Sequence, residues 1–133
     1  MDLAKKFPRS PYDMNAGVVM LPRTTDKAKA FNEGTLGEYH YNCPLDKKVF
    51  EFFDIDAETF ANKVKDLKTD KKIAEWLDKF GKTQKEKDKF NNMMRHLGPD
   101  TSEKKAWLKE QIKIHGKQVT TYFDNLDADE KRF

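Results

Sequence analysis

The sequence contains a single cysteine, Cys43, and no long hydrophobic run. One cysteine excludes an internal disulfide framework and a zinc site built from several cysteines. No apolar stretch approaches the length of a transmembrane helix. Lys5, Lys6 and Arg9 are not followed by the apolar segment of a secretory signal. We therefore expect a soluble protein in the reducing cytoplasm, without a membrane partner.

The composition is that of a folded chain. Of the 133 residues, 37% are hydrophobic and 37% are charged, and ten Phe and two Trp supply apolar surface for a core. Such a core offsets the chain entropy that keeps other highly charged sequences disordered. The length fits one domain, 1–133. We expect an irregular arm at 1–22, a helical body at 23–116 and a C-terminal tail at 117–133 packed on the body.

Positive charge is concentrated in the second half of the chain. Residues 1–66 carry 10 Lys and Arg against 11 Asp and Glu, whereas residues 67–123 carry 14 against 8. The basic residues are almost all Lys interleaved with Glu and Asp, a pattern typical of a solvated helix face. Because no Arg-rich recognition helix accompanies them, we expect no nucleic-acid partner.

Repeated capping residues and apolar stripes predict six short helices. The first is expected from Thr24 or Thr25 to Asn32, and the others start after the capping residues Cys43 or Asn42, Asp56, Thr69, Thr83 and about Ser102. Pro44 suits a first helical position, and Glu86 is placed for a capping box with Thr83. Gly34, Gly81 and Gly116 are expected to end three of the helices.

The predicted fold is all-α, with five or six short helices and at most a minimal β pair. We expect any such pair to join the Val18–Leu21 segment to Glu38–Tyr41. Apolar residues at helical spacing predict the core. The expected core residues are Trp76, Leu77, Phe80, Phe90, Met94, Trp107 and Leu108.

Four stretches of the chain resemble a known bacterial family, domain of unknown function 5069. They are Arg9-Ser10-Pro11-Tyr12, Leu21-Pro22-Arg23 with Asp26-Lys27-Ala28, the segment from Gly34 to Asp46, and Thr121-Tyr122-Phe123-Asp124. The resemblance spans nearly the whole chain. It implies a single compact bacterial domain and brings no particular activity, substrate or cofactor with it.

Side chains capable of chemistry are concentrated between Gly37 and Asp46. Cys43 precedes a proline at an expected helix N-terminus, where the helix dipole stabilises a thiolate, and His40 lies three residues upstream as a base. These two residues are the catalytic candidates. The alternative is structural: Cys43 is then a buried cap and His40 orders a loop. No protease or hydrolase motif surrounds them.

A second set of residues predicts an anion or small-molecule site. Arg23 before a helix start could hold a phosphate or carboxylate, although an ion pair with Asp26 or Glu38 is the alternative. The candidate ligand-binding residues are Arg23, Asp26, Glu38, Tyr39, His40 and Asn42. The mixed set of Glu38, His40, Cys43 and Asp26 lacks a recognised metal spacing, so we expect no metal site.

Two functions follow from these patterns. The first is a small-molecule or anion site, in which His40 and Cys43 lie near Arg23 or Asp26 around a partly open pocket. The second is a helical protein-interaction module without catalysis, in which the same polar residues only stabilise the fold. The sequence leaves the reaction, ligand, cofactor and oligomeric state open.

Overall fold

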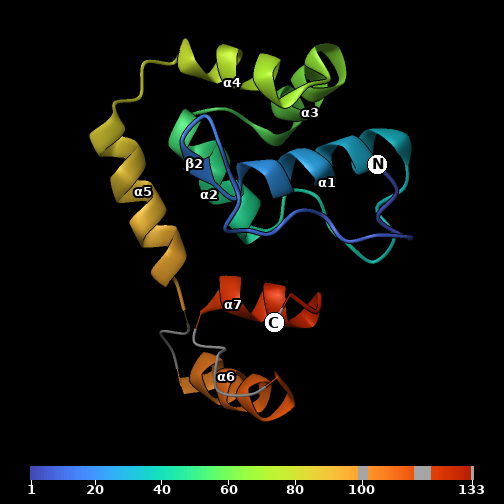
Figure 1. Ribbon diagram of the computed structural model, residues 1–133, viewed down its shortest axis with the longest axis vertical. Coiled ribbons are helices and arrows are strands. Elements are labelled where there is room, and N and C mark those ends of the chain that lie inside the picture. The colour runs from blue at the N-terminus through green and yellow to red at the C-terminus, as the bar shows by residue number, and fades with distance from the viewer. Residues whose placement is uncertain (99–101, 116–120, 133) are drawn as a thin grey trace.

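The computed structural model describes residues 1–98, 102–115 and 121–132. A short hairpin is followed by a series of helices (Figure 1). The elements are β1 (Met14–Asn15), β2 (Val18–Val19), α1 (Leu21–Glu33), α2 (Pro44–Phe53), α3 (Ala57–Leu67), α4 (Asp70–Asp78), α5 (Gln84–His96), α6 (Ser102–His115) and α7 (Tyr122–Asp129). The prediction of a mostly helical fold with a minimal β pair is therefore confirmed.

Most helix starts lie where the capping residues predict them. Cys43, Asp56, Thr69 and Thr83 precede α2, α3, α4 and α5, and Thr83 forms the expected capping box with Glu86. Gly34 ends α1 with a φ of 71°. Gly116, which we expected to end α6, lies outside the described residues.

Helix α1 begins earlier than predicted. Its first residue is Leu21, so Thr24 and Thr25 lie inside the helix, and the Thr25 hydroxyl donates to the Leu21 carbonyl at 2.8 Å. Pro22 sits in the first turn, where a missing N–H leaves no helical hydrogen bond unmade. The predicted irregular arm at 1–22 therefore ends two residues earlier, because a proline fits the first turn of a helix as well as it fits a loop.

The β pair forms with a different partner from the one predicted. Met14 pairs with Val19 and Asn15 with Val18 in an antiparallel register. Ala16 and Gly17 connect the strands with φ values of 53° and 74°. Two left-handed residues make the two-residue turn that closes a tight hairpin. The predicted pairing with Glu38–Tyr41 was therefore wrong, and that segment is a loop.

The core lies between α1, the hairpin and the surrounding helices. In Figure 1, α3 and α4 lie on one side of α1, α5 runs along the end near β2, and α7 lies opposite, with α6 beyond it. The most buried large side chains come from β2, the adjoining Met20, α1 to α5 and α7: Phe60, Phe123, Met20, Leu21, Ile73, Leu77, Met94, Val18, Val19, Val49 and Val64.

The predicted core residues divide into two groups. Leu77, Phe90 and Met94 are buried as expected, and Trp76 is partly buried against the core. Phe80 and Trp107 are 37% and 38% exposed, and Leu108 is only partly buried, so these three predictions were wrong. Phe80 follows the end of α4, and Trp107 belongs to α6, whose strongest contacts are with α7 alone.

A buried amide joins α5 to the hairpin. Asn91 is 4% exposed; its Oδ1 accepts the Val19 N–H at 2.9 Å, and its Nδ2 donates to the Gly17 carbonyl at 2.8 Å. The side chain thus takes the place of a third strand for the edge of β2.

Asn91→Ala should lower the free energy of unfolding by about 1–3 kcal/mol, because it leaves the buried Val19 N–H and the partly buried Gly17 carbonyl without their partner. Urea denaturation measures the loss. The neighbouring Asn92, which is exposed on the same helix, supplies the control. Asn92→Ala should change stability by less than about 0.5 kcal/mol. Equal effects of the two substitutions would show that the Asn91 bonds contribute nothing.

Candidate functional site

Arg23 lies in a buried ion pair. Its guanidinium donates to both carboxylate oxygens of Glu130 at 2.8 and 2.7 Å, and the two residues are 2% and 4% exposed. The Tyr39 hydroxyl donates to the same carboxylate at 2.8 Å, and the Arg23 guanidinium lies over the Tyr39 ring. Two predicted site residues thus meet, but they meet on a carboxylate from the C-terminal tail.

The pKa values of these groups reflect the pairing. Burial raises the pKa of Glu130, but the hydrogen bonds from Arg23, Arg132 and Tyr39 outweigh it and leave the pKa below its usual value. Burial is the largest cause that raises the pKa of Tyr39, and the hydrogen bond to Glu130 raises it further. Because the pKa of Glu130 is lower in the folded state than in the unfolded state, its carboxylate stabilises the fold at pH values above the usual Glu pKa. That contribution is lost as the pH falls through the folded-state pKa.

Asp26 lies in a second cluster. It is 1% exposed, and Arg9 donates to it from its backbone N–H at 2.9 Å and from its guanidinium at 3.1 and 3.0 Å. Arg9 also pairs with Asp70 at the start of α4, whose pKa this hydrogen bond lowers. Arg9 therefore fixes the arm to α1 through Asp26 and to α4 through Asp70.

Cys43 and Asn42 belong to a third cluster, centred on the fully buried Asp46. Asp46 accepts from Lys27 Nζ at 2.7 Å, from the Thr24 hydroxyl at 2.7 Å, and from the backbone N–H groups of Asn42 and Cys43 at 3.1 and 3.3 Å. Lys27 Nζ also lies 3.2 Å from Cys43 Sγ. An ammonium and a helix N-terminus therefore both face the thiol, which is partly buried.

Glu38 and His40 are exposed on the loop between α1 and α2. Within the described part of the chain, no hydrogen bond joins His40 to Cys43. The structure thus separates the predicted site residues into the Arg23–Tyr39 pair, the Asp26 cluster, the Cys43–Asn42 cluster and two exposed side chains.

Cys43 borders a cavity of about 520 Å³, which we call the Cys43 cavity. Its wall comes from the start of α2, the end of α5, α6 and α7, and it is mostly apolar and aromatic. The lining residues are Cys43, Pro44, Leu45, Lys48, Leu97, Gly98, Trp107, Tyr122, Asn125 and Leu126. Its volume is within the usual range for sites that hold small molecules.

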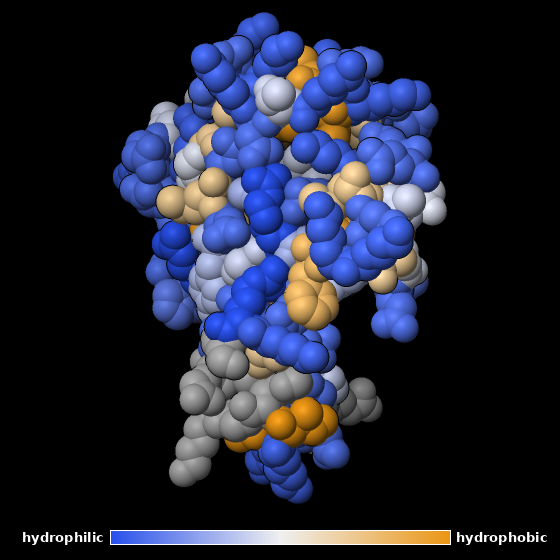
Figure 2. Space-filling view, turned by 45° about the vertical axis from the view of Figure 1, so that its right-hand side comes forward, coloured by the Kyte–Doolittle hydropathy of each residue, from blue (hydrophilic) through white to orange (hydrophobic). Residues whose placement is uncertain are grey.

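One buried polar atom at this cavity has no hydrogen-bond partner in the part of the chain that the structure describes. Asn125 Oδ1 is buried, and it is the only buried side-chain oxygen or nitrogen in the described residues without a hydrogen bond. Beside it, the Trp107 and Tyr122 rings pack with centroids 5.7 Å apart. The α6 end of the molecule also presents apolar side chains to the surface (Figure 2).

A larger cavity of about 760 Å³, the arm cavity, lies between the N-terminal arm and the loop after α1. Glu38 and Tyr39 line it together with Lys5, Lys6 and Asp129. Gly37 allows the arm to lie this close, because its φ is 60° and an added Cβ would come within 2.9 Å of Ala4 Cα. The Tyr39 hydroxyl is already bonded to Glu130, so the arm cavity offers mainly exposed charges.

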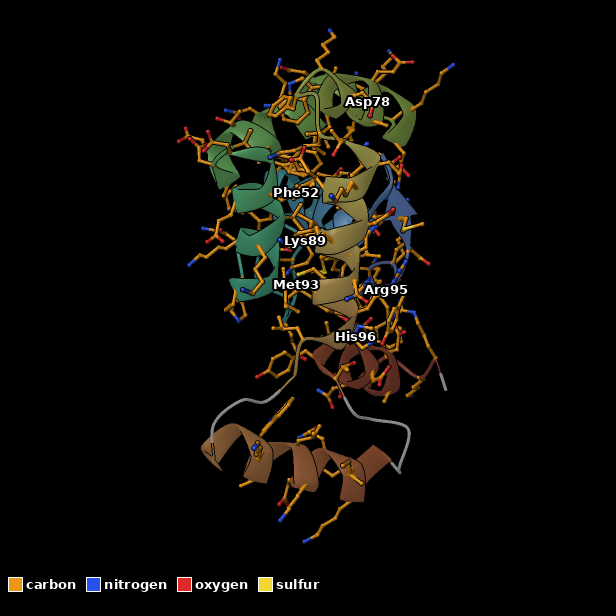
Figure 3. The ribbon with its side chains drawn as sticks, turned by 90° about the vertical axis from the view of Figure 1, so that its left-hand side faces the viewer. Phe52, Asp78, Lys89, Met93, Arg95 and His96 are labelled. Carbon is orange, nitrogen blue, oxygen red and sulfur yellow. The ribbon has the colours of Figure 1, made fainter. Side chains whose placement is uncertain are left out.

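A third, shallow depression of about 370 Å³ lies between α2 and α5. Figure 3 shows Phe52 of α2 beside Lys89 and Met93 of α5 on this face. Met93 is 41% exposed, and Lys82 Nζ lies over the Phe52 ring. This groove between α2 and α5 has an apolar floor, and side chains of both positive and negative charge lie at its rim.

Sequence reasoning missed the partners that complete these clusters. Arg9 and Glu130 are 17 and 107 residues from Asp26 and Arg23, so no local spacing relates them. Lys27 and Asp46 are 19 residues apart, so no local spacing relates them either. No sequence signal identified Asn125. Among the described residues, no group of three or more His, Cys, Asp or Glu could hold a metal ion.

The structure thus shows a small helical fold. Buried ion pairs hold α1 in place, and α2 begins beside an apolar cavity. Residues 5–132 match the family model of the domain of unknown function DUF5069, and the chain belongs to this family. No curated protein matches the chain. No helix in the described residues is both long enough and apolar enough to span a bilayer.

Proposed function

We propose that this chain binds a small molecule in the Cys43 cavity, beside the 38–46 segment. The observation that carries the proposal is an apolar cavity of about 520 Å³ with an unpaired buried acceptor, Asn125 Oδ1, in its wall. A buried acceptor without a partner costs free energy, and pockets that combine apolar walls with a few polar groups are typical of ligand sites.

In this proposal the three polar clusters have different roles. Cys43 contacts the ligand, and Lys27 and Asp46 hold the start of α2 in place. Arg23, Tyr39 and Asp26 anchor the loop and the arm through Glu130 and Arg9. A catalytic role for Cys43 or His40 stays a prediction, as does ligand contact by Glu38 and Asn42.

Alkylation of Cys43 tests the proposal. Because the chain has one cysteine, iodoacetamide reports on a single site. Naphthalene-2-carboxylate and 2-naphthol serve as probes of the size and apolarity of the cavity. If a bound probe excludes the reagent, the alkylation rate should fall about elevenfold at a probe concentration ten times its dissociation constant.

A cavity-filling variant provides the matched comparison. Leu126→Trp should abolish the protection, whereas Leu36→Trp, outside the cavity, should leave it intact. If the thiol resists alkylation, the emission of Trp107 in a Trp76→Phe background reports the same binding. Rates and emission that stay unchanged with both probes would overturn the proposal.

The second candidate is a helical protein-interaction module, and the groove between α2 and α5 favours it. Phe52 and Met93 would contact the apolar face of a partner helix, and Lys82, Lys89 and Glu86 at the rim would pair with its flanking charges. This candidate becomes the better one if neither probe protects Cys43.

The proposal also includes the cellular location of the protein. We place the protein in a bacterial cytoplasm, because the family resemblance is bacterial and the single cysteine is a free thiol. Such thiols persist in reducing compartments.

A further inference from the structure

The described residues in the wall of the Cys43 cavity carry charge of one sign only. Among the described residues that line the cavity, Lys48, on the second turn of α2, is the only one with a formal charge at neutral pH, and none of them carries a carboxylate. Its side chain is partly buried and makes no ion pair with any residue in the described ranges. An unpaired ammonium beside an apolar wall attracts an anionic group.

The buried acceptor Asn125 Oδ1 places a second requirement on the ligand of the Cys43 cavity. Asn125 Oδ1 is buried at the same wall and receives no hydrogen bond from the described residues. Polar atoms in this situation are almost always paired in folded proteins, so a partner from outside the chain is expected. A hydroxyl or N–H group on a ligand supplies that donor.

The apolar part of the wall indicates the body of the ligand. Trp107 and Tyr122 contribute aromatic rings at a tilt of 47°, and Leu45, Leu97 and Leu126 contribute aliphatic surface. Aromatic side chains favour offset-stacked or edge-on contact with another ring. A flat aromatic or compact aliphatic body is thus the best match.

From these three observations we infer that the Cys43 cavity takes a small apolar anion that also carries one hydrogen-bond donor. The anionic group pairs with Lys48, the donor bonds to Asn125 Oδ1, and the apolar body packs against Trp107. This inference rests on the proposed function and gives its ligand a chemical class. Lys48 and Asn125 are then the residues that determine specificity.

Isothermal titration with three related probes tests the inference. The probes are 6-hydroxynaphthalene-2-carboxylate, which has both groups, naphthalene-2-carboxylate, which lacks the donor, and 2-naphthol, which lacks the charge. The first should bind about 3–10-fold more tightly than naphthalene-2-carboxylate, as expected for one hydrogen bond. It should bind at least about threefold more tightly than 2-naphthol, since a partly exposed ion pair contributes modestly.

Two variants assign each preference to its residue. Lys48→Gln should remove the preference for the carboxylate, and Asn125→Leu should remove the preference for the hydroxyl. Lys47→Gln, on the exposed neighbouring lysine, should change neither.

The outcomes distinguish a wrong ligand class from a cavity that binds no small molecule. Equal affinities for the three probes, or preferences that persist in both variants, would overturn the ligand class while the cavity still binds. If no probe binds and Cys43 alkylation is unprotected, the proposed function fails together with the inference.

Discussion

Arg23→Ala should lower the free energy of unfolding by about 3–5 kcal/mol, because it leaves the buried Glu130 carboxylate without its main partner. Arg23 and Glu130 are 2% and 4% exposed, so water replaces the lost guanidinium poorly. Arg132 still contacts Glu130 in the variant, which places the expected loss near the lower end of that range. Urea denaturation followed by circular dichroism measures it.

A matched arginine and a double variant control the experiment. Arg95→Ala, on α5, removes a contact with the Met14 sulfur and no ion pair among the described residues, so it should change stability by less than about 0.5 kcal/mol. Arg23→Ala with Glu130→Ala should cost less than the sum of the two single losses, because neither charge is then buried alone. Additive losses, or an Arg23→Ala loss as small as that of Arg95→Ala, would contradict a buried ion pair.

Phe123→Ala should cost about 3–5 kcal/mol, the range for a fully buried phenylalanine. Phe123 is 0% exposed, and its ring meets that of Tyr12 edge-on with centroids 5.2 Å apart. The Tyr12 hydroxyl in turn donates to Asp124 at 2.6 Å. The substitution therefore opens a cavity where the arm, α7 and the core meet.

Phe7→Ala provides the comparison for the same chemical change at an exposed position. Phe7 is 49% exposed, so its loss should cost less than about 1 kcal/mol. Thermal or denaturant unfolding of the two variants side by side gives the difference. A Phe123→Ala protein as stable as Phe7→Ala would show that α7 does not pack into the core.

Local chemistry made most of the helices predictable. Asp56, Thr69 and Thr83 accept hydrogen bonds from backbone N–H groups three residues later, and such caps mark helix starts wherever they occur. The predicted start of α1 was wrong because the sequence signal there, a proline, occurs both in loops and in helices. The prediction places Pro22 in the irregular arm at 1–22, but proline is also common in the first turn of a helix.

The long-range partners of the site residues could not be predicted. The sequence singles out Arg23 and Asp26 as candidate ligand-binding residues, but whether an arginine faces a ligand or a carboxylate depends on chain folding. Glu130 and Arg9 reach them from the tail and the arm, and no spacing in the sequence encodes those contacts. Exposure of Trp107 has the same origin, because α6 contacts mainly α7 and the extent of that contact depends on chain folding.

Cys43 shows the opposite case. The sequence placed it before Pro44 at a helix start, and the structure agrees. The nearby ammonium is Lys27 and not the predicted imidazole of His40, at 3.2 Å from the sulfur. A helix periodicity places Lys27 in α1, but only the packing of α1 against the start of α2 brings its amine to the thiol.

The most direct test of the central claim is a crystal structure of the protein soaked with 6-hydroxynaphthalene-2-carboxylate. We predict the naphthalene ring in the Cys43 cavity, the carboxylate at Lys48 and the hydroxyl within hydrogen-bond distance of Asn125 Oδ1. A ligand bound instead in the arm cavity beside Glu38 and Tyr39, or an empty Cys43 cavity at a saturating concentration, would contradict the account.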